Sequence, residues 1–181
     1  TCGNARYICA IGRLVHQKGF DVLIRAFAKM EARNARLVIL GEGPLRKELA
    51  DLAEVLGVGD RVSMPGFVEE PWQILANASV FALSSRWEGF GNVLVEALAV
   101  GVPIVATDCP GGPRDILDGG RYGMLVPVDD VTALSEALDR ALANPVGTEA
   151  SRRQRAKEFS VAEIAPRYLR VLLDGIECNS T

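Results

Sequence analysis

The sequence predicts an α/β fold, with a doubly wound parallel sheet of about six strands followed by C-terminal helices. Two observations lead to this prediction. Short runs of consecutive apolar residues, such as LVIL, VFAL and PIVA, alternate with segments of helical periodicity. Strands buried on both faces have this uninterrupted apolar pattern, because neither face meets water. Strand and helix patterns then alternate about five times, which is typical of a parallel sheet with helices on both faces.

Six segments qualify as strands by this criterion. They are Tyr7–Ile11, Leu37–Leu40, Arg61–Met64, Val80–Leu83, Pro103–Ala106 and Gly123–Val126. Helices are indicated where apolar residues recur every three or four positions and so fall on one face. Four such sets are Phe20, Leu23, Phe27 and Met30; Leu45, Leu49, Leu52 and Leu56; Val131, Leu134, Leu138 and Leu142; and Ile164, Tyr168 and Leu172. About the last 35 residues lack a strand candidate and are expected to form two or three helices.

Particular residues mark where some helices begin. Pro44 and Pro71 each suit a first helical position, where the missing N–H of proline costs nothing. Asp129 or Asp130 is expected to cap the helix after Pro127, because a carboxylate there accepts hydrogen bonds from free backbone N–H groups.

Composition limits the classes of protein to consider. A chain of 181 residues, 49% hydrophobic and 24% charged, suits a single globular domain over residues 1–181. Its net charge is −3, and Lys and Arg form no run of five, so neither nucleic acid nor an anionic membrane is indicated as a partner. The longest apolar runs are too short to span a membrane, and no signal peptide is visible.

The cysteines point to a reducing compartment and away from a metal site. Cys2, Cys9, Cys109 and Cys178 form no C-x-x-C pair, and the chain has one histidine, which argues against a zinc site. Scattered thiols in a chain of this size fit a cytoplasm, and the Ala-rich composition suits a bacterial one. The chain begins at Thr1 and reaches strand-like sequence almost at once, so we expect an excised fragment or a processed chain.

A ligand is expected beyond the carboxyl ends of the strands, where open parallel sheets bind their ligands. Glycine in those loops would let the backbone approach a ligand closely. The loops are Gly12–Gly19, Gly41–Pro44, Pro65–Glu70, Ser84–Asn92 and Thr107–Pro113. For Thr107–Pro113, a ligand loop and a simple tight turn are equally compatible with the sequence.

The Gly12–Gly19 loop carries two cations, Arg13 and Lys18, just before a predicted helix. Free N–H groups and the helix dipole add to their charge, so an anion such as a diphosphate is favoured there. The alternative is a pair of solvated surface cations. His16 stands between them, and we expect it to be a solvated loop histidine.

Two glutamates flank the start of a helix predicted from Asn92 to Gly101. Glu88 precedes it, beside Gly89 and Gly91, and Glu96 lies about one turn inside. Both would point to one pocket above the sheet, where paired carboxylates accept hydrogen bonds from sugar or ribose hydroxyls. The alternative is an ordinary first-turn glutamate followed by an ordinary helix glutamate.

Taken together, these segments resemble the retaining glycosyltransferases of family four, whose GT-B fold contains a Rossmann-like donor-binding domain in its C-terminal half. The resemblance covers roughly Tyr7 to Asp130. It rests on G-R-L-V-x-Q-K-G-F-D, V-I-L-G-E-G-P, P-G-F-V, S-S-R-W-E-G-F-G-N-V-L-V-E-A-L-A-x-G-x-P-I-V-A-T-D and T-D-C-P-x-G-P, each at a predicted strand end and in this order. The last two forms resemble most closely enzymes that move a hexose or N-acetylhexosamine onto a lipid-linked or polysaccharide acceptor.

The resemblance implies catalytic and donor-binding roles at matching positions. Arg13 and Lys18 match the pair that grips the donor diphosphate, Glu88 the first signature glutamate, which faces the donor sugar, and Glu96 the second, which binds the ribose. The remaining matches surround the base, the nucleoside and the phosphates. They are Gly12, Gly41, Gly43, Phe67, Val68, Gly89, Phe90, Gly91, Asn92 and Val93.

The resemblance also implies how the whole protein works. The substrate would be a nucleoside-diphosphate sugar, most naturally a UDP-sugar, although ADP and GDP donors occur in related enzymes. No metal cofactor is expected, in agreement with the lack of a D-x-D sequence. Acceptor contacts, and often a catalytic histidine, come in the family from an N-terminal domain that this sequence does not contain. We therefore expect the chain to bind nucleotide without transferring sugar, and the full-length protein to be cytoplasmic or at the inner face of the membrane.

The sequence departs from the family pattern at one position, and three other classes of protein share some of its features. Asp115 stands where the family usually has Glu after the Gly-Gly turn. A sugar-nucleotide epimerase or a phosphorylase shares the two-domain architecture, although no lysine has a recognisable pyridoxal-phosphate context. A glycosidase would use Glu88 and Glu96 as acid and nucleophile, about 5–5.5 Å apart. A nucleotide-binding module without catalysis is the third alternative.

The helices from Val161 to Ile176 have apolar faces that would pack toward the N-terminal domain.

Overall fold

The computed structural model describes residues 6–177 and centres on one six-stranded sheet. The strand order is β3-β2-β1-β4-β5-β6, and each neighbouring pair is parallel. The predicted α/β fold is therefore confirmed. Each observed strand lies within one or two residues of its prediction: β1 (Tyr7–Ile11), β2 (Arg36–Leu40), β3 (Val62–Gly66), β4 (Val80–Leu83), β5 (Ile104–Thr107) and β6 (Met124–Val126).

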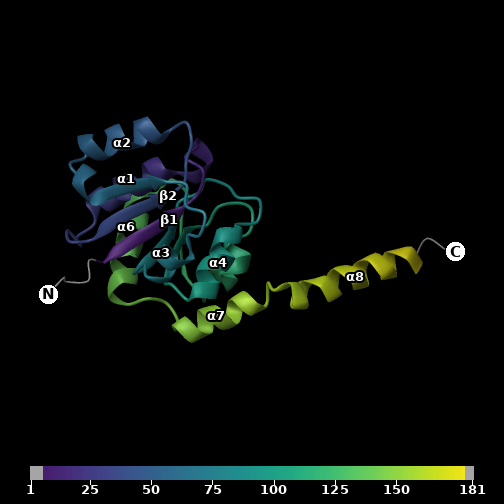
Figure 1. The fold of residues 1–181 in the computed structure, drawn as a ribbon. Helices are drawn as coiled ribbons and strands as arrows, with labels where there is room; N and C mark the ends of the chain where they lie inside the picture. Colours follow the sequence, from purple (N-terminus) through teal and green to yellow (C-terminus); the bar gives the residue numbers. More distant parts are fainter. Residues whose placement is uncertain (1–5, 178–181) are drawn as a thin grey trace.

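Helices cover both faces of this sheet (Figure 1). One face packs on α1 (Phe20–Lys29), α2 (Arg46–Val55) and α6 (Val131–Ala143). The other packs on α3 (Trp72–Ala76), α4 (Asn92–Val100), α5 (Pro113–Ile116) and α7 (Glu149–Lys157). Three short 3₁₀ turns, η1 (His16–Lys18), η2 (Gly59–Arg61) and η3 (Asp118–Gly120), lie in the connections, and α8 (Val161–Glu177) ends the described chain.

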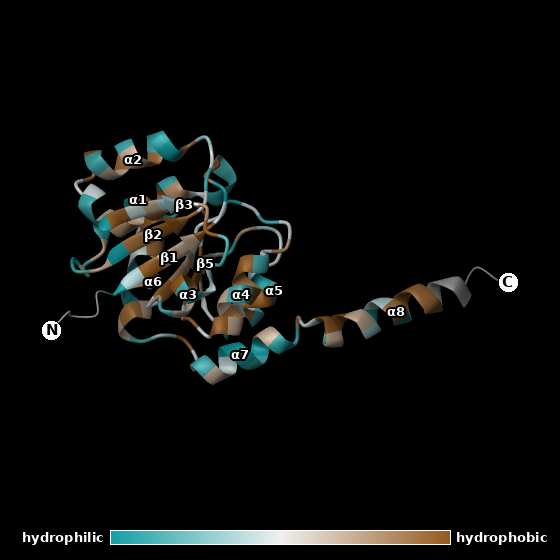
Figure 2. Cartoon of the chain, viewed as in Figure 1, coloured by the Kyte–Doolittle hydropathy of each residue, from teal (hydrophilic) through white to brown (hydrophobic). Residues whose placement is uncertain are grey.

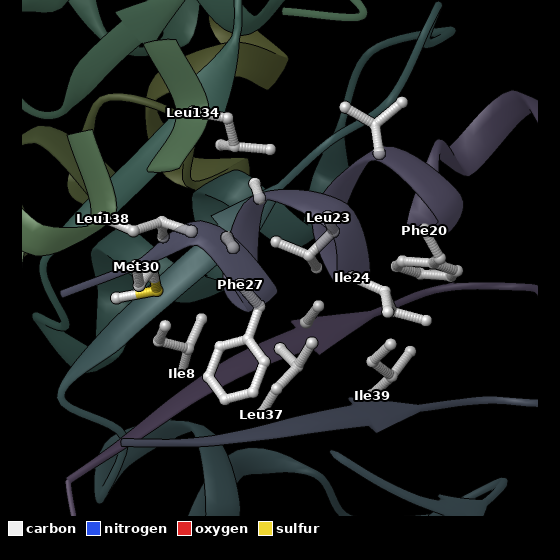
Figure 3. Close-up of a cluster of buried hydrophobic side chains, with 14 of the residues drawn as sticks. Ile8, Phe20, Leu23, Ile24, Phe27, Met30, Leu37, Ile39, Leu134 and Leu138 are labelled. Carbon is white, nitrogen blue, oxygen red and sulfur yellow. The ribbon is translucent and has the colours of Figure 1, made fainter. Parts of the chain in front are cut away.

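The strands divide their side chains between two cores. In β1, Ile8 and Ala10 join the cluster under α1 and α6, whereas Cys9 joins the cluster under α4. Successive side chains of a strand point to opposite faces, and here both faces are buried. The uninterrupted apolar runs follow from this arrangement. Figure 3 shows Phe27 of α1 among Ile8 and Leu37 of the first cluster, and Phe27 is fully buried.

The structure settles one helix start and corrects another. The side chain of Asp130 accepts hydrogen bonds from the N–H groups of Thr132 (3.0 Å) and Ala133 (2.9 Å), so Asp130 is the cap of α6. Pro71 directly precedes α3. The prediction for Pro44 was wrong, because α2 begins two residues later at Arg46. The Leu45 N–H donates to the carbonyl of Leu14 (3.1 Å), which holds this segment in a turn against the loop after β1.

Two of the four cysteines lie within the described residues. Cys9 and Cys109 are free and buried, whereas Cys2 and Cys178 lie outside the described residues. Burial raises the pKa of Cys9 to about 12, so its thiol is unreactive near neutral pH. Between residues 6 and 177, no helix combines the length and the apolarity needed to cross a membrane.

The predicted C-terminal helices are present as α7 and α8. The α7 helix packs on α4, but α8 extends away from the sheet and its helices (Figure 1). Figure 2 shows apolar residues along α8. Among them, Tyr168 is 69% exposed and Leu172 62% exposed. The apolar face expected on this helix is therefore unpartnered within the described chain.

Replacing Phe27 with alanine should destabilise the fold by about 3–5 kcal/mol, because the substitution empties a fully buried site beneath α1. The control is Phe67→Ala, the same change at a side chain that is 77% exposed, which should cost less than about 0.5 kcal/mol. Urea unfolding measures both free energies. Equal losses in the two variants would contradict the assignment of Phe27 to the core.

Candidate functional site

The loops predicted to bind a ligand do meet at one edge of the sheet. Strand order reverses between β1 and β4, which are neighbours, so the loops after these two strands lie on either side of the switch point. Ligands of doubly wound sheets bind at this point. The two loops are Gly12–Gly19, which leads into α1, and Ser84–Gly91, which leads into α4.

Both helices that leave these loops begin without a side-chain cap. Gly19 precedes α1 and Gly91 precedes α4, each in a left-handed conformation and without a capping side-chain hydrogen bond. The first N–H groups of a helix have no partner within the helix, so these two helix starts favour an anion.

Lys18 and Glu88, both predicted site residues, form an ion pair across the switch point. The Lys18 Nζ lies 2.7 Å from the Glu88 Oε1, with side-chain exposures of 17% and 7%. The Ser85 hydroxyl donates to the same oxygen at 2.5 Å. An ammonium has three donor hydrogens, so two remain after Lys18 bonds to Glu88. The residue predicted to bind the diphosphate, Lys18, thus lies beside the residue predicted to face the sugar, Glu88.

A pocket of about 530 Å³ lies beside this pair, over the ends of β1, β2 and β3. Six predicted residues line it: Gly12, Arg13, Gly41, Phe67, Val68 and Glu96. Of the two predicted glutamates, Glu96 lines this pocket and Glu88 does not. The reason is the ion pair, which directs the Glu88 carboxylate to Lys18.

Sequence reasoning missed part of this pocket. Its lining also includes Ile11, Leu40, Glu42, Glu69, Pro71 and Trp72. Trp72 is 46% exposed and Phe67 is 77% exposed, so two aromatic side chains border the opening. The available signal in the sequence was an aromatic residue four positions after the end of the P-G-F-V segment.

Glu96 reaches the pocket from the second turn of α4. Burial raises the pKa of its carboxyl group above the ordinary value. A half-buried carboxylate without an ion-pair partner in the described chain can accept hydrogen bonds from ligand hydroxyls.

The predicted residues from Gly89 to Val93 have mixed surroundings. Gly89 has open space around it, and Phe90 is 47% exposed with its ring 5.9 Å from that of Phe159. Gly91 caps α4, Asn92 is exposed, and Val93 packs partly on the core. These backbone positions form the rim beside Glu88.

Close packing between backbones explains several glycines. A Cβ atom on Gly41 would overlap the carbonyl oxygen of Gly12, and one on Gly43 would overlap the backbone of Leu14. The loop after β2 therefore lies directly on the loop after β1. These two glycines have a packing role whether or not they also contact a nucleoside.

The Thr107–Pro113 loop supports the loop after β4. The Glu88 N–H donates to the Pro110 carbonyl at 2.9 Å, and the Thr107 hydroxyl donates to the Ser85 carbonyl at 2.5 Å. A Cβ atom on Gly111 would overlap the Glu88 carbonyl oxygen. These contacts hold Glu88 in place, and they are compatible with both alternatives, a ligand loop and a tight turn.

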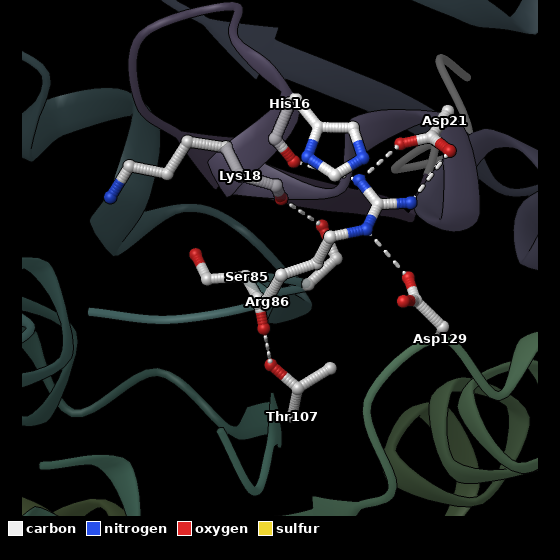
Figure 4. Close-up of polar contacts among 8 residues, drawn as sticks. His16, Lys18, Asp21, Ser85, Arg86, Thr107 and Asp129 are labelled. Carbon is white, nitrogen blue, oxygen red and sulfur yellow. Dashed lines mark hydrogen bonds and ion pairs between the residues drawn. The ribbon is translucent and has the colours of Figure 1, made fainter. Parts of the chain in front are cut away.

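Arg86 is a central residue that sequence reasoning did not assign to the site (Figure 4). Its guanidinium donates to both carboxylate oxygens of Asp21 (3.0 and 2.9 Å), and its Nε lies 2.8 Å from the Asp129 carboxylate. Burial raises the pKa of Asp21, but hydrogen bonds and charge from Arg86 outweigh it, and the net pKa is lowered. A charged residue two positions before Glu88 was the only sequence signal.

His16 is exposed, as expected for a loop histidine, and its ring centroid lies 6.2 Å from that of Trp87. No group of three or more His, Cys, Asp or Glu side chains suited to a metal ion occurs within the described residues.

The model of the family called glycosyl transferases group 1 matches residues 3–159 of the chain. The chain belongs to this family. The resemblance stated from the sequence is thereby confirmed, and a glycosidase is not the family indicated.

Two curated members of this family show how much of a longer protein the chain represents. The N-acetylgalactosamine-N,N'-diacetylbacillosaminyl-diphospho-undecaprenol 4-alpha-N-acetylgalactosaminyltransferase of Campylobacter jejuni is 36% identical over 171 residues, which are 93% of this chain and 47% of that protein. The lipopolysaccharide core biosynthesis glycosyltransferase LpsE of Rhizobium meliloti is 34% identical, over 95% of this chain and 51% of that protein. The chain thus spans about half the length of these relatives.

Solved structures agree with this assignment. Anabaena HepE, determined in complex with UDP and glucose, superposes with a TM-score of 0.85 at 26% identity, covering 94% of this chain and 49% of that chain. The lipopolysaccharide outer core galactosyltransferase WaaB has a TM-score of 0.86 at 24% identity, covering 94% and 50%, which shows the same fold.

Replacing Gly19 with alanine should destabilise the glycosyltransferase chain by more than about 2 kcal/mol. The residue has a φ of +60° and its Cβ would overlap the Ser84 carbonyl oxygen. Gly57→Ala is the matched control, because its φ is +69° but its surroundings are open. That variant should lose only about 1 kcal/mol, the cost of the left-handed backbone. Thermal unfolding compares them, and equal losses would show that contact with Ser84 does not matter.

Proposed function

We propose that this chain binds the nucleotide part of a nucleoside-diphosphate sugar at the carboxyl edge of its sheet. In the whole protein it would serve as the donor-binding half of a retaining glycosyltransferase. The observation that carries the proposal is one of placement. A nucleoside-sized pocket containing Glu96 adjoins the Lys18–Glu88 pair and two uncapped helix starts at the switch point.

The pocket suits a nucleoside. Its volume of about 530 Å³ falls in the range of small-molecule sites. The Glu96 carboxylate would accept hydrogen bonds from the two ribose hydroxyls. Phe67 and Trp72 would cover one side of the base with apolar surface.

The diphosphate would lie between the pocket and the Lys18–Glu88 pair. Arg13 lines the pocket and is exposed, so its guanidinium is free to turn toward a phosphate. Lys18 would use its remaining donors, and the N-termini of α1 and α4 would add their N–H groups. Glu88 would face the donor sugar and accept hydrogen bonds from its hydroxyls.

This arrangement supports a mechanism without a metal ion. The bond between the anomeric carbon and the diphosphate must break, and negative charge grows on the leaving group. Arg13, Lys18 and the helix starts would stabilise that charge as it forms. HepE, 26% identical, is described as a complex with UDP and glucose, which favours UDP as the nucleotide.

The acceptor would be lipid-linked or a polysaccharide, and the transferred sugar a hexose or N-acetylhexosamine. The names of the relatives support this class, since one acts on an undecaprenol-linked saccharide and another serves lipopolysaccharide core synthesis. Because the chain covers about half of each relative, we assign acceptor contacts to an N-terminal domain of the whole protein.

The first experiment is a calorimetric titration of the chain with UDP, ADP and GDP, without added metal. We expect saturable binding of UDP. Glu96→Gln should weaken it about tenfold or more, because a charge-assisted hydrogen bond to the ribose is lost. Glu70→Gln, the same change at an exposed glutamate that does not line the pocket, is the matched control and should bind normally. Failure of all three nucleotides to bind would overturn the proposal.

The affinity for UDP should also depend on pH through Glu96. Its raised pKa means that it takes up a proton at a higher pH than an exposed glutamate does. Affinity should be full above that pKa and fall as the pH drops through it. The measurement is the ratio of the UDP affinity of the wild type to that of Glu96→Gln, followed from about pH 8 down to about pH 4, because ionisation of the nucleotide phosphate affects both proteins alike. A ratio that does not change with pH would show that Glu96 does not contact the nucleotide.

We expect the 181-residue chain to bind donor without transferring sugar, because catalysis requires the acceptor to be held in reach of the anomeric carbon. UDP release from UDP-glucose, UDP-galactose and UDP-N-acetylglucosamine is the measurement. A longer protein of the length of the relatives, given acceptor lipids, is the comparison. Acceptor-dependent release by the chain alone at about 1 s⁻¹ would contradict the expectation.

A further inference from the structure

The loop after β4 donates hydrogen bonds to three consecutive carbonyl groups, those of His16, Gln17 and Lys18 in the Gly12–Gly19 loop. The Arg86 side chain donates to the His16 carbonyl (2.7 Å), the Arg86 backbone N–H donates to the Gln17 carbonyl (2.8 Å), and the Ser84 hydroxyl donates to the Lys18 carbonyl (2.8 Å). The three acceptor residues, His16, Gln17 and Lys18, form the turn η1. Every backbone acceptor of the turn that carries Lys18 is therefore bonded to one short segment, Ser84–Arg86.

Arg86 is the residue that connects this turn to the rest of the edge. Its Nη1 bonds to His16 and to Asp21 in the first turn of α1, its Nη2 bonds to Asp21, and its Nε pairs with Asp129 before α6. All three of its nitrogens are engaged, and the side chain is only 13% exposed. A planar guanidinium fits this arrangement, whereas an ammonium cannot form the paired bonds to one carboxylate.

The same contacts neutralise the negative charge of Asp21 close to the site. Asp21 lies three residues after Lys18, at the start of the helix that would face an anion. An unpaired carboxylate there would repel a diphosphate, and Arg86 pairs it through two hydrogen bonds. Figure 4 shows Arg86 between Asp21 and Asp129, with the ammonium end of Lys18 extending away from this cluster.

We infer that Arg86 is a positioning residue, which sets the place of Lys18 for the diphosphate and shields the diphosphate from Asp21. The inference rests on the proposed function, because it assigns the diphosphate to Lys18. Arg86 itself does not touch the ligand. It acts on one end of the site and not on the pocket that holds the nucleoside, since neither Arg86 nor its partners line that pocket.

The test compares the binding of UDP with that of uridine, because the ratio of the two affinities isolates the diphosphate. In Lys18→Met this ratio should fall toward one. In Arg86→Met the ratio should fall about tenfold, while uridine affinity stays within about twofold of wild type. In the double variant the loss should be smaller than the product of the two single losses, because the part of the Arg86 effect that places Lys18 is already absent in Lys18→Met. Arg153→Met removes a surface arginine of α7 that pairs with Glu149, and it should leave both affinities unchanged.

Arg86→Lys separates geometry from charge. It retains the positive charge but loses the paired bonds to Asp21, so its ratio should stay reduced. It also provides a second measurement if Arg86→Met does not fold. Equal weakening of UDP and uridine in the folded Arg86 variants would show a purely structural role and overturn the inference, as would an unchanged ratio. If the wild type binds neither UDP nor uridine, the proposed function fails and this inference fails with it. If the wild type binds UDP and the affinity ratio falls in Lys18→Met but not in the Arg86 variants, only the role of Arg86 is refuted.

Discussion

The carboxyl edge of the sheet depends on backbones that pack directly against one another. Gly41 lies on Gly12, Gly19 lies on Ser84, and Gly111 lies on Glu88, each so close that a Cβ atom would overlap a carbonyl oxygen. The contacts join the loops after β2, β1, β4 and β5, which is also the order of those strands in the sheet. Four loops therefore form one continuous surface, and none can shift without moving its neighbour.

Charge is arranged on this surface in two zones. The pocket with Glu96 lies over β1, β2 and β3, whereas the Lys18–Glu88 pair spans β1 and β4. Under the proposed function, the strand order itself would separate a nucleoside end from a phosphate–sugar end along this edge. Arg86 lies beside the second zone and connects it, through Asp21, to α1 and, through Asp129, to the start of α6. Loops carry the functional groups, and the two apolar cores under them supply the rigidity.

Most of the fold could be predicted because its signals are local. The run Val80–Leu83 is apolar on every residue, and it forms a strand buried on both faces. The repeat of Phe20, Leu23 and Phe27 is visible in a short window and becomes the buried face of α1. Pro44 was misplaced because a distant contact, from Leu45 to Leu14, decides where the next helix begins. In the candidate site, glycines and charges at strand ends identified the two loops, but neither Trp72 nor Arg86 stood out from ordinary helix and surface residues.

Patterns within the chain were enough to predict the fold class, the six strands, the family and the loops at the carboxyl edge of the sheet. These follow from periodicity and from residues that are close together in the chain. Only the tertiary structure decided that Glu88 pairs with Lys18 while Glu96 lines the pocket, and that Arg86 joins Asp21 to Asp129. The partners in these contacts are tens of residues apart. Their meeting depends on strand order and on the close approach of glycine backbones, which no local pattern encodes.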